Sequence, residues 1–339
     1  MERETVYNVT GNIECRTMNE RQVVVFDDRI EDLAIEREIF GGIAVDLTLS
    51  GTTREHVLTD GTDAFGIIID ATVPIPADVI SALDELEIVA RSGVGFDNVD
   101  VDAARDRDIR VTNVPDYCLD EVSTHALSLI LALVRNLPVY DRRTSDGSWD
   151  WTDGVAIERL SEQTLGIVGY GNIGSRTARK AAPFFEERLA SDPYVADNTI
   201  RSDDVEPVGF EDLLARSDVI SLHPPLTEET RGMIDTSAFG KMNDETILVN
   251  TSRGEVIDQQ ALADALDQGT IAAAGLDVMA AEPPENHQLL ARNDVLVTPH
   301  AAWYSNQSLV DLRRGAAREV KRTLEDEPPK HPVEEQEWI

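Results

Sequence analysis

The stretch that decides the fold is TLGIVGYGNIGSRTARKAA, residues 164–182. It opens with a short apolar run, Leu165–Val168, that is typical of a buried strand, and it closes with a helical segment from Ile173 to about Ala182. Three glycines occupy the turn between them with the spacing G-x-G-x-x-G: Gly169, Gly171 and Gly174. A strand, a glycine-rich turn and a helix in this order predict a β-α unit of a doubly wound parallel sheet.

An acidic residue follows this unit at the distance that dinucleotide-binding sheets use. Asp192 comes eighteen residues after Gly174, at the end of the next short strand. Gly169 would permit the tight turn and Gly171 would let the backbone approach a pyrophosphate, which the helix N-terminus attracts. Asp192 would accept hydrogen bonds from both ribose hydroxyls and repel a 2′-phosphate, so we expect NAD rather than NADP. The alternatives are a glycine turn without a ligand and an Asp192 that only shapes the turn before Pro193.

The rest of the chain alternates short apolar runs with helical stretches, which is typical of parallel sheets with crossover helices. In the first part the runs are Val23–Phe26, Ile67–Ile69, Glu87–Ala90 and Arg110–Val114. In the second part they are Leu165–Gly169, Leu189–Asp192, Val219–His223, Ile247–Asn250, Ala273–Val278 and Val295–Thr298. The length of 339 residues suggests two domains. We expect two doubly wound α/β domains, Rossmann-like and flavodoxin-like, with a ligand at the carboxyl ends of the strands.

One long helix is expected from about Leu119 to Leu137. Its apolar residues cover most of its circumference, so it must be buried on several sides. The helix could lie inside its own domain or in a dimer interface. We predict a homodimer that forms through this region.

The charge balance excludes several classes of partner. Lysine and arginine number 30 and aspartate and glutamate 64, so the net charge is −34. This charge argues against binding to nucleic acid or to an anionic membrane. The acid is spread along the chain, which favours a halophilic protein adapted to molar salt over one with a merely acidic surface.

The remaining composition fits a soluble, cytoplasmic protein. Hydrophobic residues make up 42%, the apolar runs are too short to span a membrane, and the N-terminus has no signal-peptide core. We expect the first twenty or so residues to be a loose extension. The two cysteines, Cys15 and Cys118, form neither a disulfide framework nor a metal motif, and we predict no metal site.

Six further motifs, two before the glycine motif and four after it, occur in a characteristic order: "ARSGVGFDNVDVDAA", "VTNVPDYCLDEVSTHAL", "SLHPPLTEETRGMID", "VNTSRGEVID", "GLDVMAAEPP" and "TPHAAW". Together with the glycine motif they resemble the D-isomer-specific 2-hydroxyacid dehydrogenase family, from about Val23 to about Pro332. The end of the last motif, His300–Ser305, looks most like the branch that contains the C-terminal binding proteins.

The resemblance implies three catalytic residues for the reduction of a 2-oxo acid with NADH. His300 would donate the proton, Glu282 would hydrogen-bond its other ring nitrogen, and Arg253 would bind the substrate carboxylate and polarise the carbonyl. Each residue taken alone could instead be structural: a histidine at a strand end, a loop acid before two prolines, and an arginine in a surface turn. As an ordered set they favour catalysis.

The same matching implies further contacts to NAD and to the substrate. The cofactor residues would be Gly169, Gly171, Asn172, Ile173, Gly174, Asp192, His223, Pro224, Thr230, Thr251, Ser252 and Asp277, the last at the nicotinamide carboxamide. Substrate contacts would come from Arg91, Ser92, Gly93 and Val94, whose backbone can form an anion nest, and from Trp303. The other histidines, His56, His125, His287 and His331, are interpreted as structural.

The resemblance also implies the division of the chain. The NAD-binding domain would be residues 115–311, and a discontinuous substrate domain would be residues 1–114 and 312–339, with the active site in the cleft between them. Residues 66–76 contain no lysine or arginine and carry Asp70 where relatives with phosphorylated substrates have an arginine. Formate dehydrogenases of this superfamily have glutamine where Glu282 stands. Phosphorylated substrates and formate are therefore disfavoured.

Two functions fit these features. The first is an NAD-dependent dehydrogenase of a small 2-hydroxy acid, which the intact set Arg253, Glu282 and His300 favours. The second is an NAD(H)-sensing corepressor-like or scaffold protein on the same fold, because fold alone does not decide function.

Overall fold

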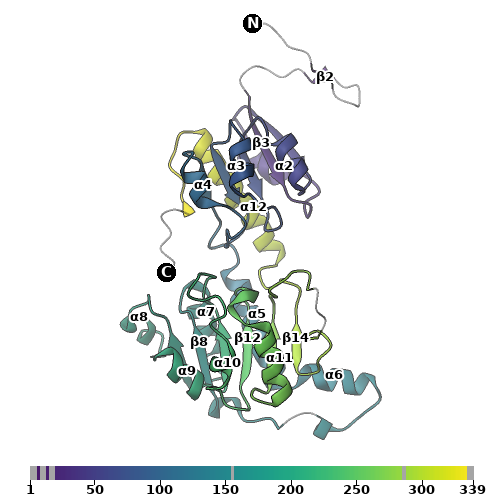
Figure 1. The fold of residues 1–339 in the computed structure, drawn as a ribbon, viewed down its shortest axis with the longest axis vertical. Coiled ribbons are helices and arrows are strands. Elements are labelled where there is room, and N and C mark those ends of the chain that lie inside the picture. The colour runs from purple at the N-terminus through teal and green to yellow at the C-terminus, as the bar shows by residue number, and fades with distance from the viewer. Residues whose placement is uncertain (1–5, 8–12, 15–19, 154–155, 285–287, 334–339) are drawn as a thin grey trace. The chain divides into compact units, whose positions relative to one another are not determined.

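The computed structural model describes residues 6–7, 13–14, 20–153, 156–284 and 288–333, and its chain forms two compact units. Unit 1 takes the chain as far as Tyr117 and again from Asn306, and unit 2 is Cys118–Ser305 (Figure 1). The sequence prediction places these boundaries after residues 114 and 311. Most of the expected N-terminal extension lies outside the described residues. In its described parts, β1 (Val6–Tyr7) and β2 (Ile13–Glu14) pair as antiparallel strands.

Unit 1 is built on a five-stranded parallel sheet with the order β4-β3-β5-β6-β7. The strands are β3 (Arg21–Phe26), β4 (Val45–Ser50), β5 (Ala64–Ile69), β6 (Ile88–Arg91) and β7 (Arg110–Thr112). The helices are α1 (Ala34–Ile39), α2 (Arg54–Asp60), α3 (Ala77–Ala82), α4 (Val101–Arg105) and α12 (Asn306–Leu324). Counted within this unit the order is 2-1-3-4-5, which is the flavodoxin-like arrangement.

Unit 2 is built on a seven-stranded parallel sheet with the order β10-β9-β8-β11-β12-β13-β14. The strands are β8 (Thr164–Val168), β9 (Glu187–Ser191), β10 (Glu206–Pro207), β11 (Val219–Leu222), β12 (Ile247–Asn250), β13 (Ala273–Leu276) and β14 (Val295–Val297). The helices are α5 (Leu119–Val134), α6 (Leu137–Ser145), α7 (Asn172–Ala181), α8 (Asp197–Arg201), α9 (Phe210–Arg216), α10 (Thr236–Phe239) and α11 (Gln259–Gln268). Within the unit the order is 3-2-1-4-5-6-7, a Rossmann sheet extended by one strand. Both predicted doubly wound sheets are confirmed.

Alternate residues of the central strands face two different helix layers. In β11, Val219 packs in a cluster with Leu129 of α5 and Ala178 of α7. Its neighbour Ile220 packs instead in a cluster with Leu213 of α9 and residues of α10 and α11. The sheet is therefore buried on both faces, which leaves its strand ends as the places where polar side chains can gather.

The predicted long helix ends earlier than expected. α5 stops at Val134, and Asn136 adopts a left-handed conformation (φ 54°) before α6 begins at Leu137. Asparagine tolerates this conformation better than most residues, so the chain turns here. α5 packs against β12, β13 and α7, which accounts for its buried residues inside unit 2. Among the described helices none is long and apolar enough to cross a membrane alone; α5 and α6 meet that criterion only as a pair bent by 60°.

Candidate active site

The glycine turn between β8 and α7 lets two backbone segments touch. Gly169 has φ 84°, and a Cβ there would lie 2.8 Å from the backbone of His223 and Pro224. A Cβ at Gly174 would overlap the carbonyl oxygen of Gly169. No side chain caps the first turn of α7, which begins after Gly171, so its backbone N–H groups are available to an anion. The turn therefore has the space and the donors that a pyrophosphate requires.

Asp192, which directly follows β9, holds this turn in place. One carboxylate oxygen accepts the N–H of Tyr170 at 2.7 Å, and the other accepts the N–H groups of Tyr194 and Val195 at 2.9 and 3.1 Å. The predicted turn role of Asp192 is thus present. The same residue also lines a hollow of about 290 Å³ whose other lining residues are Ala190, Asp197, Ile200, Pro207, Val208 and Gly209. The residues of this hollow that follow β10 were missed in the sequence, because a two-residue strand leaves almost no pattern.

His223 and Thr230 are bound within their own loop. The Nε2 of His223 lies 2.9 Å from the Ser221 hydroxyl, and burial lowers the pKa of His223 to about 3, so the ring is neutral. The Thr230 hydroxyl donates to the Pro225 carbonyl at 2.6 Å and accepts the Thr227 N–H at 2.8 Å. Both residues shape the loop after β11, and their contact with a cofactor stays a prediction.

The loop after β12 carries Arg253. Asn250, fully buried at the end of that strand, accepts the N–H and hydroxyl of Ser252 and donates to the Arg253 carbonyl at 2.8 Å. The neighbouring Thr251 hydroxyl is buried and has no hydrogen-bond partner among the described residues. Since a buried hydroxyl without a partner is costly, Thr251 fits a site in which a bound cofactor supplies the missing partner.

His300 and Glu282 form the pair that the sequence predicts. The Nδ1 of His300 lies 2.6 Å from the Glu282 Oε2, and Glu282 Oε1 accepts the Met279 N–H at 2.9 Å. Burial raises the pKa of Glu282, but hydrogen bonding to His300 and the charges of His300 and Arg253 outweigh it, and the pKa lies below its ordinary value. Glu282 is therefore a carboxylate at neutral pH. It accepts from Nδ1–H and leaves His300 Nε2 for another partner.

The turn that presents His300 is held by Asp277. His300 has φ 51°, a left-handed conformation that costs a non-glycine residue roughly 1 to 2 kcal/mol. The Asp277 carbonyl accepts the His300 N–H at 2.8 Å, and its carboxylate accepts the N–H groups of Ala301 and Ala302, both at 2.9 Å. Because Asp277 is almost fully buried, these bonds are protected from water. The predicted contact of Asp277 with a carboxamide stays a prediction beside this observed role.

The predicted anion nest lies at the end of β6 in unit 1. Arg91 ends that strand and donates from Nη1 to the Ser92 carbonyl at 2.8 Å. The Ser92 N–H is bound to the Ile69 carbonyl, and Gly93 has φ 151°. The Val94 carbonyl accepts from the Asn113 amide at 2.6 Å. Trp303, the remaining predicted substrate residue, belongs to unit 2, where its ring meets that of Tyr304 edge to face.

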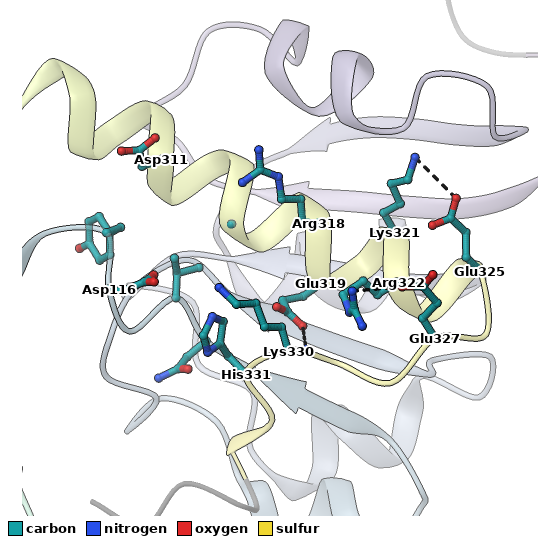
Figure 2. Close-up of a pocket in the computed structure, with 14 residues that line it drawn as sticks. Asp116, Asp311, Arg318, Glu319, Lys321, Arg322, Glu325, Glu327, Lys330 and His331 are labelled. Carbon is teal, nitrogen blue, oxygen red and sulfur yellow. Dashed lines mark hydrogen bonds and ion pairs between the residues drawn. The ribbon is translucent and has the colours of Figure 1, made fainter. Parts of the chain in front are cut away.

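A larger hollow in unit 1 contains none of the predicted site residues (Figure 2). It measures about 470 Å³ and lies along α12 and the segment near Lys330. Its charges are mixed, and two of its cations are already paired, Lys321 with Glu325 and Arg322 with Glu327. In the described part of the chain no group of His, Cys, Asp and Glu side chains is placed to hold a metal ion.

Comparison with known proteins finds relatives that are similar in sequence and in fold. Residues 127–302 match the NAD-binding domain of the D-isomer specific 2-hydroxyacid dehydrogenases. The D-3-phosphoglycerate dehydrogenase of Archaeoglobus fulgidus is 34% identical over 91% of this chain, which spans 59% of that relative's length. The hydroxypyruvate reductase of Thermotoga maritima is 37% identical over 69% of this chain and 76% of its own. A D-lactate dehydrogenase from Aquifex aeolicus, solved with NAD and lactic acid, superposes with a TM-score of 0.82 at 27% identity, over 90% of this chain and 96% of that one.

Proposed function

Since this chain belongs to the D-isomer specific 2-hydroxyacid dehydrogenase family, we propose that it reduces a small 2-oxo acid with NADH, or oxidises the 2-hydroxy acid in the reverse direction. The observation that carries the proposal is the 2.6 Å pair of His300 and Glu282, with Arg253 close enough for its charge to act on Glu282. These three residues supply a proton donor, its orienting carboxylate and a cation for the substrate carboxylate.

The chain's own residues would act as follows. Bound NADH would supply the hydride that reduces the carbonyl carbon. The Arg253 guanidinium would bind the carboxylate and hold the carbonyl oxygen toward His300. His300 would release the proton at Nε2 to that oxygen, while Glu282 stabilises the charged ring through Nδ1. In the opposite direction His300 would remove the proton from the hydroxyl.

The test is NADH oxidation with purified protein at about 2 M KCl, a salt level chosen to screen the acidic surface. The substrates are glyoxylate, pyruvate, hydroxypyruvate, phenylpyruvate and 4-methylthio-2-oxobutyrate. Turnover of at least one of them supports the proposal. Tight NADH binding without turnover of any 2-oxo acid would contradict it and favour the NAD(H)-sensing scaffold instead.

We expect the enzyme to prefer hydroxypyruvate over 3-phosphohydroxypyruvate by about 100-fold in kcat/KM, because a phosphate beside a carboxylate is repelled. Asp70 follows β5 at the same sheet edge as the anion nest and is 2% exposed. It accepts the N–H and hydroxyl of Thr72, and Arg29 Nε lies 3.4 Å away. Asp70→Asn should reduce the ratio of the two kcat/KM values, whereas Asp78→Asn, at an exposed position of α3, should leave the ratio unchanged. Equal kcat/KM values for the two substrates would contradict the prediction.

We also propose a homodimer. Three large apolar side chains in and just beyond α6 are strongly exposed: Leu137 (55%), Trp149 (92%) and Trp151 (83%). Large exposed apolar side chains of this kind occur at protein interfaces, and Leu137 lies in the region through which the sequence predicts the dimer. Light scattering at 2 M KCl should give about twice the chain mass of 37.4 kDa, and Trp149→Ser with Trp151→Ser should lower it. The replacement Tyr194→Ser, also exposed but on another part of unit 2, is the control. A monomeric wild type would exclude the dimer.

Finally, we propose that the protein works in a cytoplasm of high salt. At 0.1 M salt the Debye length is about 10 Å, so the charges that sum to −34 repel one another across neighbouring side chains. At 2 M KCl this repulsion is screened, and we expect the unfolding midpoint to rise by roughly 10 °C, or a few kcal/mol. Sodium chloride at the same ionic strength should act alike. Equal midpoints at 0.1 and 2 M KCl would exclude the adaptation.

A further inference from the structure

One histidine set aside as structural is connected to the turn that carries His300. His125 comes from the middle of α5, a helix that otherwise packs against the sheet of unit 2. Its Nε2 lies 2.9 Å from the Thr298 hydroxyl and 3.5 Å from the Asp277 Oδ1, and its side chain is 25% exposed. Thr298 directly follows β14 and stands two residues before His300.

The direction of each hydrogen bond in this chain of groups can be worked out from the donors available. The Thr298 Oγ1 lies 2.6 Å from the Asp277 Oδ1. The Asp277 carboxylate also accepts two backbone N–H groups of the turn, so it acts only as an acceptor. Thr298 must therefore give its single hydroxyl proton to Asp277. Its contact with His125 then requires His125 Nε2–H to be the donor.

We infer that His125 is a positioning residue for His300, acting through Thr298 and Asp277. By donating from Nε2 it fixes the rotation of the Thr298 hydroxyl, and the hydroxyl proton then holds the Asp277 Oδ1 in place. Asp277 in turn binds the N–H groups of His300, Ala301 and Ala302 and keeps His300 in its left-handed conformation. The inference rests on the proposed function, in which His300 donates the proton.

The tautomer of the His125 ring can be measured without any turnover of substrate. The hydrogen-bond chain requires a proton on His125 Nε2, whereas the ring of free histidine exchanges between both tautomers. In protein labelled with ¹⁵N at histidine, the His125 ring should show the Nε2–H pattern, with or without NADH. The variant Thr298→Val removes the nearer acceptor and leaves only the Asp277 Oδ1 at 3.5 Å, so it should weaken this preference. An Nδ1–H pattern in the wild type would overturn the inference.

Kinetics test the effect on His300. His125→Leu should lower kcat about 10-fold, because a small displacement of a catalytic group is costly, and change the KM for NADH less than twofold. His125→Gln, which keeps an N–H donor of similar reach, should recover most of kcat. His125→Leu combined with Thr298→Val should be no slower than Thr298→Val alone, since both act through one hydroxyl. His56→Leu, at a histidine of unit 1 bonded to Thr53 in its own helix turn, should have no effect.

The outcomes separate the two proposals. A slow His125→Leu that glutamine does not rescue would show that only packing was lost, which overturns the inference and leaves the dehydrogenase intact. A wild type that reduces none of the 2-oxo acids would contradict the proposed function. The ring pattern of His125 and its response to Thr298→Val would still decide whether the hydrogen-bond chain exists.

Discussion

Replacing His300 with alanine is expected to lower kcat for 2-oxo acid reduction by about 10³, because a positioned proton donor contributes 10²- to 10⁴-fold. The Kd for NADH should stay within twofold of the wild-type value. The residues expected to bind the pyrophosphate and the ribose are the glycine turn and Asp192, and His300 is not among them. Steady-state NADH oxidation gives kcat, and NADH fluorescence titration gives the Kd. His331→Ala, a histidine of unit 1 near the C-terminus, is the matched control and should behave as wild type.

Glu282→Gln separates orientation from charge in the same pair. Glutamine has a single oxygen, so it can accept the Nδ1–H bond only by giving up the bond from the Met279 N–H, and it lacks the charge that stabilises a protonated ring. We therefore expect an intermediate loss in kcat. The pKa of Glu282 is depressed, so its carboxylate persists as the pH falls from neutral and is lost only on passing below that depressed value. The hydrogen bond between the Glu282 carboxylate and His300 is therefore present at neutral pH and is lost in acid.

For the first substitution, a near wild-type kcat in His300→Ala would show that His300 is not the proton donor.

The sequence predicts the parts of this site that one short segment determines. The bounds of β8 and α7 differ by one residue from those predicted from residues 164–182. The prediction succeeds because the spacing of the glycines is specific to a tight turn between a strand and a helix. His300 and Glu282 meet as expected, since β13 and β14 are neighbours and their carboxyl ends share one sheet edge. Strand β4 was missed: it is an edge strand, only half-buried along its length, so it lacks the continuous apolar run of the others.

What the sequence does not show is how each polar side chain is satisfied. The sequence predicts that the Thr230 hydroxyl contacts a cofactor, but in the structure this hydroxyl donates a hydrogen bond to the Pro225 carbonyl. In the sequence His125 is interpreted as structural, because its partner Thr298 lies 173 positions away. Long-range pairs of this kind depend on strand order and helix packing together. Only the folded chain brings the histidine of α5 to the strand end that precedes His300.

A substitution in the glycine turn is expected to have the second large effect, on the affinity for NADH. Gly174→Ala should raise the Kd for NADH about 100-fold, or roughly 2.7 kcal/mol. The added Cβ would overlap the Gly169 carbonyl oxygen and would lie 3.1 Å from the Ile167 side chain. Since a backbone atom cannot rotate away, α7 must shift from β8, and overpacking of this kind costs 1 to 3 kcal/mol or more. The N–H groups that would bind the pyrophosphate move with the helix. NADH titration and thermal unfolding measure the two consequences.

The control is Gly240→Ala, which ends α10 in the same unit. Its added Cβ would meet only ordinary contacts, at 3.4 and 3.6 Å, so neither the Kd nor the unfolding midpoint should change much. If Gly174→Ala lowered stability but left the Kd unchanged, the helix would be packed as observed while the pyrophosphate bound elsewhere. Loss of both together is the expected result, because the residue that lets helix and strand approach is also the one that sets where the first N–H groups of α7 point. Folding and cofactor binding would then depend on the same missing Cβ.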